Sequence, residues 1–145
     1  MYQADTFVTS NITTLDTEKL PTSSSFHFER LNQIQKGEIA LYITGNEQLI
    51  HLTRNREYTL GRQAEGQSIF PDVDLTSFQA HNLGVSRLHA VLRVSENQVK
   101  IKDLGSINKT FINKKPIPPK KLVTLHHGDT ITLGKLDILI LMPET

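Results

Sequence analysis

Three short polar clusters hold the side chains best suited to binding a ligand. They are Gly61-Arg62, Ser86-Arg87-Leu88-His89 and the run from Asp103 to Asn113. Arginine supplies planar, permanently charged N–H donors, while serine and asparagine add hydroxyl and amide donors. Because the clusters are rich in donors and show no nucleophile grouped with a base, they favour binding of an oxyanion over catalysis. A phosphate ester, with a charge of about −1.5 to −2 and three acceptor oxygens, matches these donors.

Each cluster falls at a junction between a predicted strand and a loop. From Glu38 onward, short runs of apolar and β-branched residues are separated by Gly, Asn, Asp or Pro, and none sustains a helical period. Strands are expected at 39–43, 49–53, 57–61, 88–94, 98–102, 110–113, 122–125, 130–133 and 136–142. This spacing predicts an all-β antiparallel sandwich or barrel. Loops at one end of a sandwich converge, so the three clusters are expected to meet.

Two of these strands carry a further signal. Leu136–Met142 has apolar residues on both faces and is expected to be central in its sheet. Val99–Lys102 alternates apolar and basic residues, which predicts one buried and one exposed face. Two long loops remain, Gln63–Val85 and the one around Gly105–Lys109, and long loops on a β scaffold commonly carry binding residues.

The N-terminal part of the chain differs in composition. Ten of the first 25 residues are Ser or Thr, and the apolar residues between them are too scattered to cover a helix face or to alternate along a strand. Residues 1–36 are therefore expected to form a flexible tail, with a short helix near 28–35 that ends at Gly37. Residues 37–142 are expected to form the β domain.

The composition fits one ordinary soluble domain. A chain of 145 residues has room for a single core. Its 16 Lys and Arg against 15 Asp and Glu argue against a strongly basic arm for nucleic acid. The absence of cysteine excludes disulfides, thiolate metal sites and cysteine nucleophiles. The longest apolar run, Ile138–Met142, is far shorter than the roughly 18 residues of a membrane span, and the start of the chain lacks a secretory pattern, so a cytoplasmic location is expected.

Histidines and lysines offer alternatives that the sequence does not favour. His89 has no carboxylate or second histidine at ligand spacing, and His126-His127 on a strand would face opposite sides, so we predict no metal site. Lys114-Lys115 and Lys120-Lys121 flank a proline-rich loop, but two short pairs without interleaved aromatic residues are more typical of a solvated loop than of a nucleic-acid site. No cofactor, no nucleic-acid partner and no membrane partner are expected.

The motifs resemble the forkhead-associated (FHA) domain family, whose members bind phosphothreonine peptides on an eleven-stranded β-sandwich. The family pattern places Gly-Arg after an early strand, then Ser-Arg-x-His, then Asp-Leu-Gly-Ser-Thr-Asn-Gly-Thr-Phe-x-Asn, and late in the domain Gly-Asp-x-Ile-x-Leu-Gly. This chain follows that order with the three clusters above and with Gly128–Gly134. The resemblance spans about Glu38 to Met142.

The resemblance implies that Arg62, Ser86, Arg87 and Asn108 bind the phosphopeptide, and the hydroxyl donor Ser106 of the third cluster completes the predicted binding set. Within that set, Arg62 and Ser86 correspond to the principal phosphate ligands. Arg87 is implied to contribute through its backbone or its side chain, and Ser106 adds a hydroxyl. Asn108 is implied to hold the main chain of the peptide.

The remaining motif positions include two matches and two departures. Gly61 and His89 match positions that the family uses for architecture. Ile107 stands where the family usually has Thr, which removes a hydroxyl able to bond the phosphate, at a cost of roughly 1 kcal/mol. Lys109 stands where the family usually has Gly, and a left-handed backbone costs a non-glycine residue roughly 1 to 2 kcal/mol. Ile107 and Lys109 are therefore candidate additional contacts in a reshaped loop, Lys109 as a cation beside the phosphate.

These observations predict a non-enzymatic module that binds phosphothreonine in a partner protein or peptide and acts in Ser/Thr kinase signalling, most simply as a monomer. The alternative is an FHA fold that binds its partners independently of phosphate, which the two departures suggest.

The tail itself offers a candidate ligand. Thr13 and Thr14 are adjacent and are followed by an acid, Asp16. Some small stand-alone FHA proteins resemble this arrangement, with a kinase-phosphorylated N-terminal threonine that binds the domain of its own chain. A flexible linker of about 20 residues spans roughly 25 Å, enough to reach one end of a small domain. Phosphorylation of Thr13 or Thr14 is thus a hypothesis for self-regulation, and a merely disordered leader is the alternative.

Overall fold

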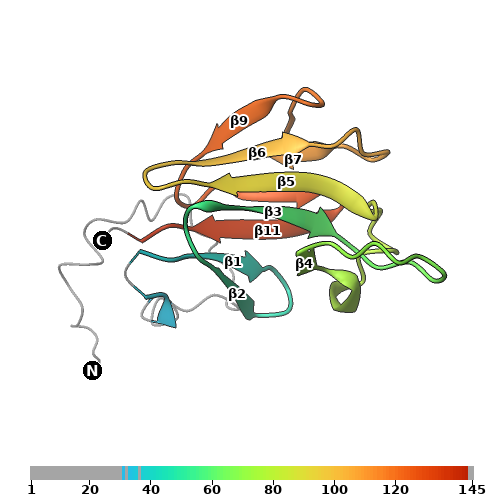
Figure 1. The fold of residues 1–145 in the computed structure, drawn as a ribbon, viewed down its shortest axis with the longest axis horizontal. Helices are drawn as coiled ribbons and strands as arrows, with labels where there is room; N and C mark the ends of the chain where they lie inside the picture. The colour runs from blue at the N-terminus through green and yellow to red at the C-terminus, as the bar shows by residue number, and fades with distance from the viewer. Residues whose placement is uncertain (1–30, 32, 36, 144–145) are drawn as a thin grey trace.

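The structure, a computed structural model, describes residues 31, 33–35 and 37–143. Within these ranges the chain forms eleven β-strands, shown in Figure 1. The strands are β1 (Ile39–Ile43), β2 (Gln48–Leu52), β3 (Arg56–Gly61), β4 (Val73–Asp74), β5 (Leu88–Val94), β6 (Val99–Asp103), β7 (Thr110–Ile112), β8 (Lys115–Pro116), β9 (Leu122–Leu125), β10 (Thr130–Leu133) and β11 (Leu136–Leu141). A short 3-10 helix, η3 (Thr76–Phe78), follows β4.

The strands form two stacked sheets. One sheet has six strands in the order β2-β1-β11-β10-β7-β8, and the other has five in the order β4-β3-β5-β6-β9. Figure 1 shows β3 and β5 of one sheet running alongside β11 of the other, and the core shared by residues of both sheets shows that they lie face to face. The core between them joins fully buried residues from both sheets, such as Leu41 of β1 and Leu92 of β5. The predicted all-β sandwich is confirmed.

Two predicted strand positions are confirmed as well. β11 lies between β1 and β10, and five of its six residues are buried, which is the central position that its apolar faces predicted. In β6, Val99 and Ile101 are buried, whereas Lys100 and Lys102 are partly exposed. The alternation is therefore read correctly from the sequence because the five-stranded sheet buries only one face against the core.

Two strands were not predicted. β4 lies inside the expected Gln63–Val85 loop and pairs with β3, in parallel. β8 pairs with β7 at the edge of the six-stranded sheet and includes Pro116. Each has only two residues, too few to show a period of two, and a proline in a strand is tolerated at an edge because no neighbour needs its missing N–H.

A second apolar cluster covers part of the other face of the six-stranded sheet. It contains Ala40 and Tyr42 of β1, which alternate with the residues facing the main core, and Leu139 and Leu141 of β11. Leu31 and Ile34 complete it, with 9% and 7% of their surface exposed. These two residues fall within the segment assigned to the tail, so the packed part of the chain extends back at least to Leu31.

The remaining predictions for the N-terminal segment concern residues that are not described. The Ser/Thr-rich stretch with Thr13 and Thr14 lies outside the described ranges, and so does half of the helix expected near 28–35, namely residues 28–30 and 32. Within the described ranges, no helix is long and apolar enough to cross a membrane.

Candidate functional site

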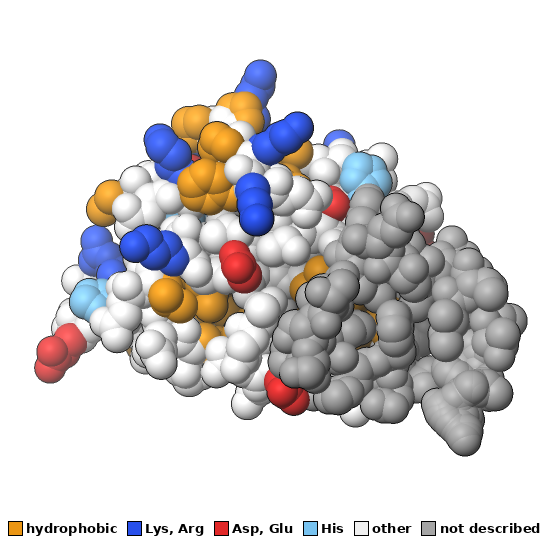
Figure 2. Space-filling view, turned by 180° about the vertical axis from the view of Figure 1, so that it is seen from behind, with side chains coloured by type: hydrophobic (Ala, Val, Ile, Leu, Met, Phe, Trp, Pro, Cys, Tyr) orange, Lys and Arg blue, Asp and Glu red, His pale blue; other side chains and the backbone are white. Residues whose placement is uncertain are grey.

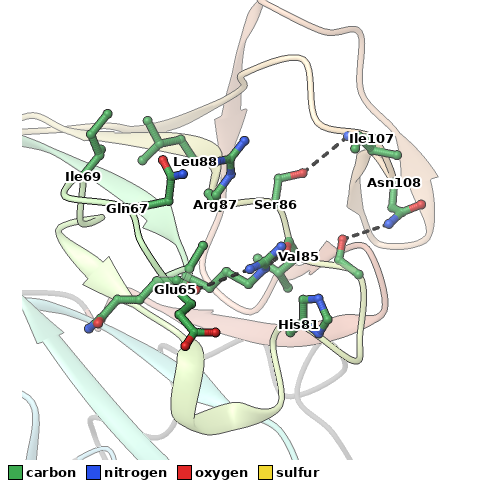
Figure 3. Close-up of a pocket in the computed structure, with 14 residues that line it drawn as sticks. Glu65, Gln67, Ile69, His81, Val85, Ser86, Arg87, Leu88, Ile107 and Asn108 are labelled. Carbon is green, nitrogen blue, oxygen red and sulfur yellow. Dashed lines mark hydrogen bonds between the residues drawn. The ribbon is translucent and has the colours of Figure 1, made fainter.

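Three loops at one end of the sandwich line a single pocket. They are the loop that follows β3, the loop that precedes β5 and the β6–β7 loop, and they bring together four predicted ligands: Arg62, Ser86, Arg87 and Asn108. Figure 3 shows Ser86 and Arg87 side by side at the centre of the pocket, with Asn108 at its far side. The fold therefore brings the three sequence clusters together at one pocket, as their positions predicted.

Arg62 is held in place by the neighbouring loop. Its Nε donates to the carbonyl oxygen of Val85 at 2.6 Å, and Nη1 donates to the carbonyl oxygen of Gln63 at 3.3 Å. A guanidinium has five N–H donors, so three of them make no hydrogen bond to any described residue. These donors are available to an anion in the pocket, and the two fixed ones orient the plane of the group.

Gly61 allows Arg62 to approach the loop before β5. A Cβ atom at Gly61 would lie 1.9 Å from the carbonyl oxygen of Arg87. That same oxygen accepts the backbone N–H of Arg62 at 3.0 Å. The β3–β5 register shifts at this point, because Leu60 pairs with Ala90 but Gly61 pairs with Leu88. The β-bulge and the absence of a side chain at Gly61 together allow the backbone of Arg62 to contact the residue that precedes β5.

His89 fixes two of the loops to each other. Its Nδ1 accepts the backbone N–H of Ser86 at 2.9 Å, so Nε2 carries the proton and donates to the carbonyl oxygen of Lys109 at 3.0 Å. The ring is fully buried. Burial lowers the pKa of His89 and outweighs the opposite effects of the Lys109 carbonyl and of Asp103. A neutral His89 thus positions Ser86 relative to the β6–β7 loop.

The buried carboxylate of Asp103 holds the β6–β7 loop in place through hydrogen bonds. Its carboxylate accepts the backbone N–H of Gly105 at 2.8 Å and that of Ser106 at 3.1 Å, together with the hydroxyls of Ser106 at 2.5 Å and Thr110 at 2.7 Å. Burial alone would raise the pKa of Asp103, but these hydrogen bonds outweigh it and hold the pKa below its usual value. The charged carboxylate of Asp103 therefore stabilises the conformation of the β6–β7 loop.

Asn108 connects the β6–β7 loop to the loop before β5. Its Nδ2 donates to the carbonyl oxygen of Gly84 at 3.0 Å, which Figure 3 marks with a dashed line. Gly84 has a φ of +82°, and a Cβ there would lie 2.7 Å from Nδ2 of Asn108. The side-chain oxygen of Asn108 remains an acceptor suited to a backbone N–H of a bound peptide.

The fourth sequence motif is structural. The buried carboxylate of Asp129 accepts the backbone N–H of His126 at 2.7 Å and the Nδ2 of Asn113 at 2.9 Å. Asn113 in turn accepts the N–H of Thr130 at 2.9 Å. These contacts hold the β9–β10 turn against the end of β7, well outside the lining of the pocket.

Comparison with known proteins settles the family. The model of the FHA domain matches residues 58–134, which contain all three loops and the fourth motif. The chain belongs to the FHA domain family. The protein FraH of a Nostoc species is 44% identical over 69 residues, which are 48% of this chain and 24% of that protein. The oxoglutarate dehydrogenase inhibitor of Corynebacterium efficiens is 34% identical over 83 residues, or 57% of this chain and 49% of that protein. The chain thus spans half or less of these curated relatives.

Solved FHA structures share the sandwich. A structure from a study of phosphothreonine-dependent FHA domain interactions is 25% identical, with a TM-score of 0.57 over 72% of this chain and 96% of that one. The FHA domain of the CT664 protein from Chlamydia trachomatis gives a TM-score of 0.60 at 24% identity, over 72% and 97% of the two chains. The eleven-stranded FHA fold implied by the motifs is confirmed.

Ser106, a predicted peptide-binding residue, is hydrogen-bonded within its own loop in this FHA domain. Both its N–H and its hydroxyl donate to Asp103. It is also absent from the residues that line the pocket. A serine hydroxyl has one proton to donate, so in this arrangement Ser106 shapes the loop and leaves its donors unavailable to a ligand.

The two departures from the family pattern leave the FHA loop intact. Lys109 has a φ of +70°, so it adopts the left-handed conformation that glycine would otherwise supply. Its carbonyl oxygen accepts from His89 and also from the backbone N–H of Gly134 at 3.1 Å, which offsets the conformational cost. Ile107 lines the pocket with 86% of its surface exposed, whereas Lys109 does not line it.

The loop after β3 adds residues that sequence reasoning did not single out. Glu65, Gln67 and Ile69 line the pocket, as does His81 from the segment before β5. The length of the predicted Gln63–Val85 loop was the available signal, because these residues match no FHA motif. Within the described ranges, no group of three histidine or acidic side chains lies together in a way that could bind a metal ion.

The buried His89 predicts a pH dependence of stability. Because its folded pKa lies below the ordinary value of 6.5, the unfolded chain binds the proton more readily than the folded one does. The free energy of unfolding should therefore fall as the pH drops below 6.5. Denaturant unfolding at several pH values checks this, with His89→Gln as the variant that should flatten the slope and exposed His81→Asn as the control that should not. An equal slope in all three proteins would contradict the assignment.

Proposed function

We propose that this FHA domain binds phosphothreonine in a partner protein or peptide and thereby mediates phosphorylation-dependent protein–protein interaction. The observation that carries the proposal is the meeting of Arg62, Ser86, Arg87 and Asn108, from three separate loops, around one pocket. No member of that set is acidic, and two are permanently charged cations.

The chemistry of the four side chains suits a phosphorylated residue within a peptide. Arg62 offers a fixed guanidinium fork, the geometry that pairs best with phosphate oxygens. The hydroxyl oxygen of Ser86 lies 3.5 Å from the N–H of Ile107, so its own proton is available to a phosphate oxygen. Arg87 is exposed at the pocket and makes no side-chain hydrogen bond or ion pair with a described residue. Asn108 supplies an acceptor for the peptide main chain.

The relatives support a regulatory, non-enzymatic role. Among proteins similar to this chain are the inhibitor described above and the glycogen accumulation regulator GarA of Mycobacterium tuberculosis, which is 32% identical over 71 residues. The matched structure from work on phosphothreonine-dependent FHA interactions supports the ligand class. On this proposal the protein is a cytoplasmic monomer and a Ser/Thr protein kinase acts upstream.

Self-regulation belongs to the same proposal and rests on the sequence alone. Thr13 or Thr14 would occupy the pocket after phosphorylation and compete with outside partners at an effective concentration of about 1 mM. Phosphorylating the full chain and comparing its peptide affinity with that of a version starting at Phe26 tests this. Equal affinities would remove the switch.

The central experiment is a titration with three versions of one peptide taken from a phosphothreonine library. We expect the phosphothreonine form to bind, the phosphoserine form to bind about five- to tenfold more weakly for lack of one methyl group, and the unmodified form not to bind. Binding of all three forms with one affinity would instead support the phosphate-independent scaffold. Calorimetry at fixed pH above 7 keeps the phosphate doubly charged throughout.

A further inference from the structure

The pocket has an aliphatic rim as well as a polar centre. Ile69, Leu88 and Ile107 line it, with exposures of 61%, 38% and 86%. Across the described ranges, the large apolar residues that stand exposed are these three, Phe70 beside Ile69, and Leu122 on β9. Three of the five are therefore gathered at one pocket. Figure 2 shows exposed hydrophobic side chains beside Lys and Arg side chains on the face turned toward the viewer. Exposed apolar groups concentrated beside polar ones mark interaction surfaces.

The rim residues lie on opposite sides of the phosphate donors. Figure 3 shows Ile69 and Leu88 on one side of Ser86 and Arg87, and Ile107 on the other. The backbone N–H of Ile107 lies 3.5 Å from the hydroxyl oxygen of Ser86, whereas Leu88 follows Ser86 by two residues and begins β5. A ligand phosphate held at Ser86 and Arg87 therefore has aliphatic surface on either flank.

An extended peptide fits this spacing. It advances roughly 3.3 Å per residue, so side chains two residues from the phosphothreonine lie on the order of 7 Å away. Leu88 follows Ser86 by two positions in the chain, at the first residue of β5, and it lines the same pocket. Flanking peptide side chains would then contact Ile69 and Leu88 on one side and Ile107 on the other.

We infer that the site selects phosphothreonine peptides that carry aliphatic side chains on both sides of the phosphothreonine, within two or three residues of it. Ile107 is central to the inference because it replaces a phosphate-bonding hydroxyl by apolar surface at the same place in the loop. The carboxylate of Glu65 also lines the pocket, so an acidic side chain beside it would lose part of the attraction that Arg62 and Arg87 provide. This inference rests on the proposed function, since the phosphate must first be bound.

The test compares two peptides that share one phosphothreonine and differ only in their flanks, aliphatic in one and serine in the other. The flanks are chosen from an oriented library with phosphothreonine fixed at the centre. The readout is the ratio of the two dissociation constants, so any change in phosphate affinity itself cancels. Wild-type protein should prefer the aliphatic peptide by about tenfold, the scale of one well-packed apolar contact.

Variants assign that preference to the rim. Ile107→Thr and Leu88→Thr should each reduce the ratio severalfold, on different flanks. Leu122→Thr is the matched control, because Leu122 also begins a strand and is 37% exposed, close to the 38% of Leu88, yet does not line the pocket. It should leave the ratio unchanged.

The outcomes separate this inference from the proposed function. Tight binding of both phosphopeptides with a ratio near one would overturn the aliphatic selectivity and leave phosphothreonine binding standing. A drop in the ratio as large for Leu122→Thr as for Leu88→Thr would also overturn it. Failure of every phosphothreonine peptide to bind would overturn both.

Discussion

Arg62→Ala is expected to weaken binding of a phosphothreonine peptide by about 100-fold or more. A hydrogen bond to a charged group contributes roughly 1.5 to 3 kcal/mol, and the fork of Arg62 can make two of them. Two lost bonds therefore correspond to at least about 3 kcal/mol, which is more than two orders of magnitude in affinity. The position of Arg62, with Nε fixed on Val85 at 2.6 Å, means that no reorganisation of the side chain is needed when the ligand arrives.

Two further variants separate the charge of Arg62 from its geometry. Arg62→Lys keeps the positive charge but loses the fork and the fixed contact of Nε with Val85, so we expect an intermediate loss of affinity. Arg93→Ala is the matched control, because Arg93 is an exposed arginine on β5 whose Nε is paired with Glu57 at 2.7 Å, outside the pocket. It should bind the peptide as wild type does.

Calorimetric titration of the four proteins with one peptide measures these affinities. Thermal melts of each confirm that the domain remains folded, which matters because Arg62 also contacts the loop before β5. A folded Arg62→Ala protein that binds within about threefold of wild type would remove Arg62 from the site. A loss for Arg93→Ala equal to that for Arg62→Ala would show a general effect of net charge.

The convergence of the binding loops was predictable because it follows from strand order and loop position alone. Arg62 follows the end of β3 and Ser86 precedes the start of β5, and a sandwich brings such ends together at one edge. The strands themselves were predictable where one face is buried and the other is exposed, as along β6. β1 shows the limit of that reasoning, since Ala40 and Tyr42 are as buried as the residues that alternate with them. Their partners Leu31 and Ile34 come from a segment without a clear pattern.

The hydrogen bonds of Ser106 to Asp103 could not be predicted from its residue type. A serine in a donor-rich loop looks like a ligand until the buried carboxylate of Asp103 is known to need donors of its own. That need arises from burial, which is a property of the folded chain rather than of the motif. Likewise, the left-handed backbone of Lys109 is stabilised by bonds from His89 and Gly134, and these join parts of the chain that lie far apart in the sequence.

Gly61→Ala is expected to destabilise the domain and to disrupt the pocket at the same time. The added methyl would lie 1.9 Å from the carbonyl oxygen of Arg87, well inside van der Waals contact. No side-chain rotation relieves this overlap, since the clashing atom belongs to the backbone and accepts the N–H of Arg62. Overpacking usually costs 1 to 3 kcal/mol, and a backbone clash belongs at the upper end, about 3 kcal/mol. The melting temperature should fall by roughly 10 °C or more.

Gly66→Ala is the control for this experiment. Gly66 lies in the same loop region after β3, and a Cβ there meets nothing within 4 Å, although its φ of +78° makes alanine mildly unfavourable. Its cost should therefore be about 1 kcal/mol, from backbone conformation alone. Because Gly61 has no positive φ, its larger effect would come from the close approach of β3 to Arg87.

Peptide affinity then decides whether that approach matters to the site. The contact between β3 and the loop before β5 is expected to hold Arg62 and Ser86 close enough to bind one phosphate. The folded fraction of Gly61→Ala protein should then bind the phosphothreonine peptide at least about tenfold more weakly than wild type does. Gly66→Ala should bind normally. Equal melting temperatures for the two variants, or an unchanged affinity in Gly61→Ala, would mean that the two loops act independently. The shared backbone contact would then have no role in holding the donors together.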